Sequence, residues 1–269
     1  MKTRLIPVIL FLIFFRPDQA WAGTISLDLR AVCRQSGQEA WVEVTAANNG
    51  DEAAREVNLT LYFRGEAASL GSWSRLPPGS SYSTQAPLRL ENGAPGDHAV
   101  LILADFHDAH GHPYSAWSYG LVHNQRPCGS LIQARLERLE LEGEGRLKLG
   151  LTNPERKAHQ VKITLVSPRE LGPFLSQKQV FLKAGEAGET GFEISSSAAN
   201  PGAEYTVLVL VEYDSAGLHC VSVAETRIRV LEEKKFFKTH RTLGLILITV
   251  LALAVILIEI LKPGGSRGS

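Results

Sequence analysis

The segment from Ala104 to Ser115, ADFHDAHGHPYS, concentrates three histidines and two aspartates. Imidazole nitrogens and carboxylate oxygens are ligands that zinc and copper(II) accept in proteins. Asp105 and His107 would share one face of a strand, while His110 and His112 would lie in or just after a turn. One interpretation is therefore a metal site formed by Asp105, His107, His110 and His112.

The segment belongs to one of two similar halves of the chain. Val42–Phe63 aligns with Leu147–Ser167, so that Asn48 meets Asn153 at an offset of roughly 105 residues. Further blocks of similar sequence follow in the same order in both halves. The pattern indicates two copies of one module.

Both halves show the period-two alternation of apolar and polar residues that is typical of half-buried strands. The first half has it at Val42–Ala46 and Val57–Phe63, and the second half has it at Leu147–Leu151. Turn-forming runs such as NNGD, PPGSS and ENGAPGD separate the strands. Short strands in units of about 100 residues predict an all-β protein with two tandem immunoglobulin-like β-sandwiches, at residues 23–128 and 129–231.

The repeat provides a control for the histidine-rich segment. Its counterpart in the second half is VEYDSAGLHCVS, from Val211 to Ser222, where Asp214 matches Asp108 and Gly217 matches Gly111. Aspartate bonds to the local backbone and glycine accepts a positive φ, so both suit a turn. The histidines are not shared between the halves. A solvated hairpin is thus the simpler interpretation, a metal site is the alternative, and no cofactor is expected.

The order of turns and strands also resembles a known group of modules. The residues concerned are the Asn49–Gly50 turn, the strand residues Val57, Leu59 and Leu61, the Leu76–Gly79 turn, the Pro95–Gly96 turn and the strand from Val100. This order resembles the bacterial immunoglobulin-like modules of CARDB type, although the second copy has Pro154 at its first turn. The resemblance implies noncatalytic spacer or binding domains on envelope and secreted proteins.

The N-terminal residues are typical of an export signal. Lys2 and Arg4 flank the start of the apolar run Leu5–Phe15, and Ala20-Trp21-Ala22 follows as a small-x-small cleavage site. At about 1.5 Å per helical residue this run is too short to cross a hydrocarbon core of about 30 Å. Residues 1–22 are therefore predicted to be a signal peptide, and the body is expected in the periplasm or outside the cell.

The C-terminal apolar run, Leu243–Leu261, has nineteen residues and a single charge, Glu259. This length predicts a transmembrane helix at 243–261, preceded by a basic juxtamembrane stalk at 232–242 and followed by a cytoplasmic stub at 262–269. Glu259 would either extend to the interface near Lys262 or contact a partner helix. The expected location is the cytoplasmic (inner) membrane, with a single pass and contact with lipid.

The chain has three cysteines, Cys33, Cys128 and Cys220. In an exported protein they are able to form disulfides. The first strand of a sandwich is long enough to bring Cys33 to the pole where the first module ends, so we predict a Cys33–Cys128 bridge, with separate thiols as the alternative. Cys220 is then expected to be a buried thiol.

The charge balance and the motifs exclude several functions. Acidic and basic residues are equal in number, at 28 each, which does not favour nucleic-acid binding. No nucleophile elbow, phosphate-binding glycine loop, H-E-x-x-H pair or Cys-x-x-Cys motif is present, so we expect no enzyme activity. Trp117 and Tyr119 have side chains of the kind that stack on sugars, although aromatic residues in strands usually belong to the core.

These observations predict a noncatalytic, membrane-anchored interaction or scaffold protein outside the cytoplasm, a subunit of a bacterial cell-envelope complex. Its partners would be other envelope or membrane proteins. The alternative is a module that binds polysaccharide or metal outside the membrane.

Overall fold

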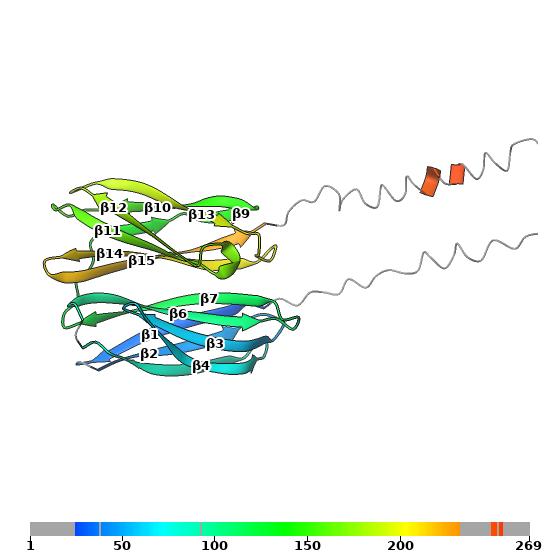
Figure 1. The fold of residues 1–269 in the computed structure, drawn as a ribbon, viewed down its shortest axis with the longest axis horizontal. Coiled ribbons are helices and arrows are strands. Elements are labelled where there is room, and N and C mark those ends of the chain that lie inside the picture. The colour runs from blue at the N-terminus through cyan, green and yellow to red at the C-terminus, as the bar shows by residue number, and fades with distance from the viewer. Residues whose placement is uncertain (1–24, 38, 92, 232–248, 252, 255–269) are drawn as a thin grey trace, which may run out of the picture.

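The computed structural model describes residues 25–37, 39–91, 93–231, 249–251 and 253–254. Two β-sandwiches lie side by side, the first built from β1 to β7 and the second from β8 to β15 (Figure 1). Each sandwich pairs a three-stranded sheet with four strands of a larger sheet, in the same strand order. A single parallel bridge between Gly96 of β6 and His219 of β15 joins the two sets of four strands. The prediction of two immunoglobulin-like sandwiches is thus confirmed at the level of architecture.

In the first module the three-stranded sheet has the order β1-β2-β5 and the opposing sheet has the order β4-β3-β6-β7, with antiparallel pairing throughout. The strands are β1 (Leu27–Ser36), β2 (Glu39–Asn48), β3 (Ala54–Phe63), β4 (Glu66–Leu76), β5 (Ser81–Leu88), β6 (Gly96–His107) and β7 (Pro113–Asn124).

In the second module β13-β10-β8 form one sheet and β12-β11-β14-β15 form the other, with the short β9 added in parallel to β15. The elements are β8 (Gln133–Leu136), β9 (Leu139–Leu141), β10 (Glu144–Thr152), β11 (His159–Val166), the 3-10 turn η2 (Arg169–Leu171), β12 (Leu175–Leu182), β13 (Ala187–Ser195), β14 (Glu204–Ser215) and β15 (Leu218–Val230).

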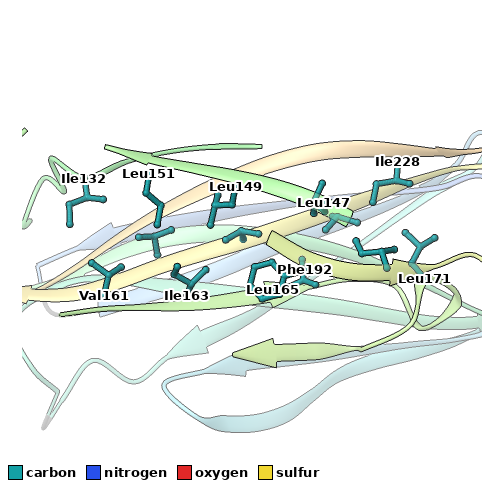
Figure 2. Close-up of a cluster of buried hydrophobic side chains, with 14 of the residues drawn as sticks. Ile132, Leu147, Leu149, Leu151, Val161, Ile163, Leu165, Leu171, Phe192 and Ile228 are labelled. Atoms are coloured by element: carbon teal, nitrogen blue, oxygen red, sulfur yellow. The ribbon is translucent and has the colours of Figure 1, made fainter. Parts of the chain in front are cut away.

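The period-two pattern explains why these segments become strands with one buried face. On β2 the alternate residues Val42, Val44 and Ala46 are fully buried, while the residues between them reach solvent. The inward-facing residues of the two sheets form one apolar core in each module. Figure 2 shows the core of the second module, where β10 and β11 contribute the row of leucine, valine and isoleucine side chains.

A buried asparagine lies at the end of equivalent strands in the two modules: Asn48 is the last residue of β2, and Asn153 directly follows β10. The Asn48 side-chain amide donates to the carbonyls of Glu52 (2.7 Å) and Leu76 (3.1 Å), and that of Asn153 donates to the carbonyl of Lys157 (2.8 Å). Both side chains are completely buried, and each also accepts a hydrogen bond from the backbone N–H two residues further on. The asparagine therefore pairs turn groups that cannot reach water.

Replacing Asn153 with alanine is expected to lower the free energy of unfolding by about 2 kcal/mol, because buried carbonyl oxygens lose their donor. The matched control is Asn58→Ala, since Asn58 lies exposed on β3 and its amide bonds only to the Glu56 carbonyl. Urea unfolding of the three proteins measures the difference. A loss at Asn58 equal to that at Asn153 would contradict the turn-pairing role.

The predicted fold class needs correction at its last element, the transmembrane helix at 243–261. In the part of the chain that the structure describes, no helix is long and apolar enough to cross a membrane. Of that range only 249–251 and 253–254 are described, and both are short helical segments. An apolar run indicates that its side chains prefer apolar surroundings, but it does not by itself specify a helical backbone. The predicted signal peptide at 1–22, the stalk at 232–242, Glu259 and the stub at 262–269 lie outside the described residues.

Candidate functional site

The two modules pack through the outer faces of their four-stranded sheets. Leu101 and Leu103 of β6 and Trp117 of β7 meet Val166 of β11 and the middle of β14. The six side chains of this interface core are nearly or fully buried: Leu101, Leu103, Trp117, Val166, Leu208 and Leu210. This apolar contact fixes the orientation of one module on the other.

A buried carboxylate joins the modules at one end of this contact. Glu170, in η2 of the second module, accepts hydrogen bonds from the Ser115 backbone N–H (2.9 Å) and hydroxyl (2.9 Å) on β7. The Ser115 hydroxyl in turn accepts one from the Arg169 backbone N–H (2.9 Å). Burial raises the pKa of Glu170, and the two Ser115 donors oppose that rise. The two hydrogen bonds from Ser115 therefore offset part of the free-energy cost of burying the Glu170 carboxylate between the modules.

A histidine stack joins the modules at the other end. The rings of His98 and His219 lie 4.9 Å apart and nearly parallel. The backbone N–H of His219 donates to the Pro95 carbonyl (2.7 Å). A Cβ at Gly96 would overlap the backbone of His219, so only glycine allows this approach. Hydrogen bonding to Glu212 raises the pKa of His219, whereas burial lowers the pKa of His98. The stack thus combines the imidazole of His219, whose surroundings favour the protonated form, with that of His98, whose burial disfavours it.

An open groove of about 1380 Å³ lies alongside this interface. β1 and β7 of the first module form one side, and β14, β15 and the turn at 200–203 form the other. Acidic residues outnumber basic ones among the described residues that line it: Asp28, Glu52, Asp108, Glu170, Glu204 and Glu225 against Arg30 and Arg227. The groove is therefore suited to a positively charged ligand.

The histidine-rich segment forms the turn between β6 and β7, at the margin of the groove. Oδ1 of Asp108 accepts hydrogen bonds from the backbone N–H groups of His110 (2.8 Å) and His112 (2.8 Å). Its Oδ2 lies 2.8 Å from His112 Nδ1 and 3.9 Å from His110 Nδ1. Burial alone would raise the pKa of Asp108, but the hydrogen bonds from His112 and His110 hold it below its ordinary value.

The structure does not bring together all four residues of the predicted metal site. His110 and His112 converge, but Asp105 pairs with Arg169 (3.2 Å), and His107 lies 3.3 Å from Glu56. Both residues lie near the end of β6, on the same face of the strand as Leu101 and Leu103. The carboxylate that meets the histidines is that of Asp108, which the sequence indicated only as a turn residue.

The predicted Cys33–Cys128 bridge is wrong, because the structure pairs Cys128 with Cys220. Cys33 is a free thiol in the described structure and packs against Gly120 in the middle of β7, before the strand reaches the linker. The linker folds back onto the second module, where the Leu131 N–H donates to the Tyr213 hydroxyl (3.1 Å). Cys220 is therefore not the buried thiol that we predicted.

The structure places Trp117 in a buried core, which was the favoured interpretation, and so does not support the sugar-binding alternative for this residue. Only 3% of Trp117 is exposed, and its Nε1 donates to the Ser167 carbonyl (3.0 Å) while its ring packs on Phe174 and Tyr62. No ring face is therefore open to a sugar. Tyr119 lines the groove half-buried, with a pKa raised by burial, and its role in carbohydrate binding stays a prediction.

Sequence reasoning missed the contact between Ser115 and Glu170. One signal was present, because the connection from β11 to β12 spans residues 167–174, whereas β3 and β4 of the first module are joined by Arg64 and Gly65 alone. The additional residues form η2, which carries Glu170 to the first module. A difference in length between two copies is thus a place to look for contacts that only one copy makes.

Comparison with known proteins gives no family for the chain. No family model matches it, and no curated protein matches it, so the CARDB-type resemblance stays a prediction. Among solved structures it is similar to red sea bream transglutaminase, at 13% identity over 78% of this chain and 31% of that chain, with a TM-score of 0.28. An Escherichia coli alpha-2-macroglobulin activated by porcine elastase has 12% identity over 79% of this chain and 22% of that chain, with a TM-score of 0.31.

The periplasmic chaperone SfaE has 10% identity over 77% of this chain and 99% of that chain, with a TM-score of 0.28. The chain spans less than a third of the transglutaminase and about a fifth of the macroglobulin. At these identities and TM-scores the similarities carry no argument about what this protein does.

Proposed function

We propose that this chain is a noncatalytic interaction protein that works outside the cytoplasm and binds a cationic segment of a partner protein. The groove between the two modules supports this proposal, because it is open and the charged side chains that line it are mainly acidic. The carboxylates of Asp28 and Glu225 are exposed and so are available to a ligand, and the exposed carboxylate of Glu204 lies 3.9 Å from Arg227 Nη1. The proposed site is thus a preformed surface between two packed modules.

The lining of the groove also supports a polypeptide as the ligand. Leu121 is 48% exposed on β7, and the half-buried rings of Tyr114 and Tyr119 lie on the same strand. Apolar and aromatic side chains beside carboxylates suit a segment in which lysine or arginine alternates with apolar residues. Electrostatic attraction would steer such a segment to the groove, and contact with the rings would hold it there.

The Cys128–Cys220 disulfide supports the proposed location. Disulfides persist in oxidising compartments such as the bacterial periplasm or the cell exterior, and are rare in the cytosol. The resemblance to modules of envelope and secreted proteins points the same way.

An oligolysine peptide should bind the full chain, and Glu204→Gln together with Glu225→Gln should weaken that binding roughly tenfold, because two carboxylates of the groove are lost. Raising the salt concentration should weaken binding to the unchanged chain. Isothermal titration calorimetry measures both effects.

The matched control carries Glu66→Gln and Glu189→Gln, which remove the same charge from exposed positions on β4 and β13, outside the groove. If both pairs of substitutions weaken peptide binding equally, the peptide responds to the net charge of the protein. That result would contradict the groove as the binding site. Absence of binding to the unchanged chain would overturn the proposal itself.

A further inference from the structure

We propose that the β6–β7 hairpin binds one divalent transition-metal ion of the zinc or copper(II) class through Asp108, His110 and His112. One ligand atom from each of these residues lies within 4.8 Å of the other two. Two ligands bound to zinc at about 2.1 Å in a tetrahedral shell lie about 3.4 Å apart. The distances from Asp108 Oδ2 to the two Nδ1 atoms, 2.8 Å and 3.9 Å, lie on either side of that value.

The carboxylate is held in place before any ion arrives. Asp108 is nine-tenths buried, and its Oδ1 accepts the N–H groups of His110 and His112. The Asp108 N–H donates to the His112 carbonyl (3.1 Å), and the Gly111 N–H donates to the Asp108 carbonyl (3.2 Å). These bonds keep the turn closed, and at Oδ2 an ion would replace the hydrogen bond that now joins it to His112 Nδ1 (2.8 Å). Such support orients a ligand and lowers the ordering cost of binding.

The two imidazoles already lie beside the Asp108 carboxylate and are exposed to solvent. The side chains of His110 and His112 are 75% and 69% exposed, so small rotations would bring their nitrogens onto one ion at little cost. Glu52, whose Oε1 accepts the Ala109 N–H (2.7 Å), adds negative charge at the same turn. Water would occupy the remaining coordination position. The donor set of two imidazoles and one carboxylate favours zinc or copper(II) over magnesium or calcium.

The equivalent hairpin of the second module, between β14 and β15, lacks the two histidines. There the β14–β15 turn has Ala216 and Gly217 at its tip, and Asp214 bonds to a single imidazole, His219 (3.2 Å). His219 is committed to the contact between the modules, where it stacks on His98. The turn itself therefore does not require the two histidines, and their presence in the first module is an addition that suits a ligand set.

The test is titration of the full chain, freed of metal by chelator, with zinc chloride and separately with copper(II) chloride. We expect one ion to bind per chain, and the His110→Ala, His112→Ala double variant to bind roughly a hundredfold more weakly or not at all. Asp108→Asn, which keeps the side-chain shape, should also weaken binding. His107→Ala is the matched control and should bind as the unchanged chain does, because His107 faces Glu56.

A second readout is the visible absorption of bound cobalt(II), which reports a low-coordinate site containing nitrogen ligands. It should be present with the unchanged chain and with His107→Ala, and absent with the double variant. Binding that survives the double substitution, or that His107→Ala reduces as much, would overturn the assignment, as would failure of the unchanged chain to bind either ion. If the double variant does not fold, as judged by circular dichroism, His110→Ala alone serves as the test.

Discussion

Replacing Cys128 and Cys220 together with alanine is expected to lower the free energy of unfolding by roughly 4 kcal/mol. The disulfide joins residues that are 92 positions apart, so its loss releases a large loop in the unfolded chain and increases the conformational entropy of that state. Alanine avoids burying a hydroxyl at position 220, which is completely buried. Urea unfolding without reductant measures the difference.

Cys33→Ala is the matched control for this prediction. Cys33 is a free, half-buried thiol, and burial raises its pKa to about 11, so it stays protonated at neutral pH. Its replacement should cost about 1 kcal/mol or less. Adding reductant to the unchanged chain should reproduce most of the loss seen in the double variant. A double variant as stable as Cys33→Ala would show that the bridge does not constrain the unfolded chain.

Trp117→Ala is expected to lower the free energy of unfolding by about 4 kcal/mol, because it removes the largest side chain of the interface between the modules. The ring centroids of Trp117 and Phe174 lie 5.0 Å apart, and those of Trp117 and Tyr62 lie 5.7 Å apart. The substitution would leave a cavity there, and it would also remove the donor to the buried Ser167 carbonyl. Thermal and urea unfolding measure the loss, and small-angle scattering reports any separation of the modules.

The matched control is Trp73→Ala on β4. Trp73 is half-buried and packs edge-on against Tyr82, away from the second module, so the expected loss is about 1–2 kcal/mol. Only Trp117→Ala should change the scattering profile and weaken oligolysine binding, since the groove lies between the modules. Equal effects of the two substitutions would contradict the role of Trp117 as the anchor of the interface.

Local patterns in the sequence predicted most of the fold. The alternation at Val42–Ala46 and Leu147–Leu151 identified strands whose inward residues are indeed buried. The alignment of Asn48 with Asn153 matched two side chains that make the same turn contacts. These predictions succeeded because strand periodicity and turn chemistry depend on residues close together in the chain.

The predictions that failed concern residues far apart in the chain. Hydrophobic patterns place a cysteine on a strand but do not determine which strand end it reaches, and so the partner of Cys128 was misassigned. Of the four candidate metal ligands, His110 and His112 do converge, because their spacing is local, and their binding of an ion stays a prediction. The choice of Asp105 over Asp108 was wrong because Arg169, from the other module, binds Asp105.

The sequence by itself thus determined that this protein contains two copies of one sandwich, where their strands lie and which turn carries the additional histidines. Only the tertiary structure decided how the copies meet, and with that the disulfide pairing, the buried place of Trp117 and the acidic groove. The physical reason is that the outer faces of both four-stranded sheets carry apolar residues which, in the sequence, cannot be distinguished from core residues. Whether such a face is solvent-exposed, binds a partner or packs on its own second copy depends on shape complementarity, and this exists only after folding.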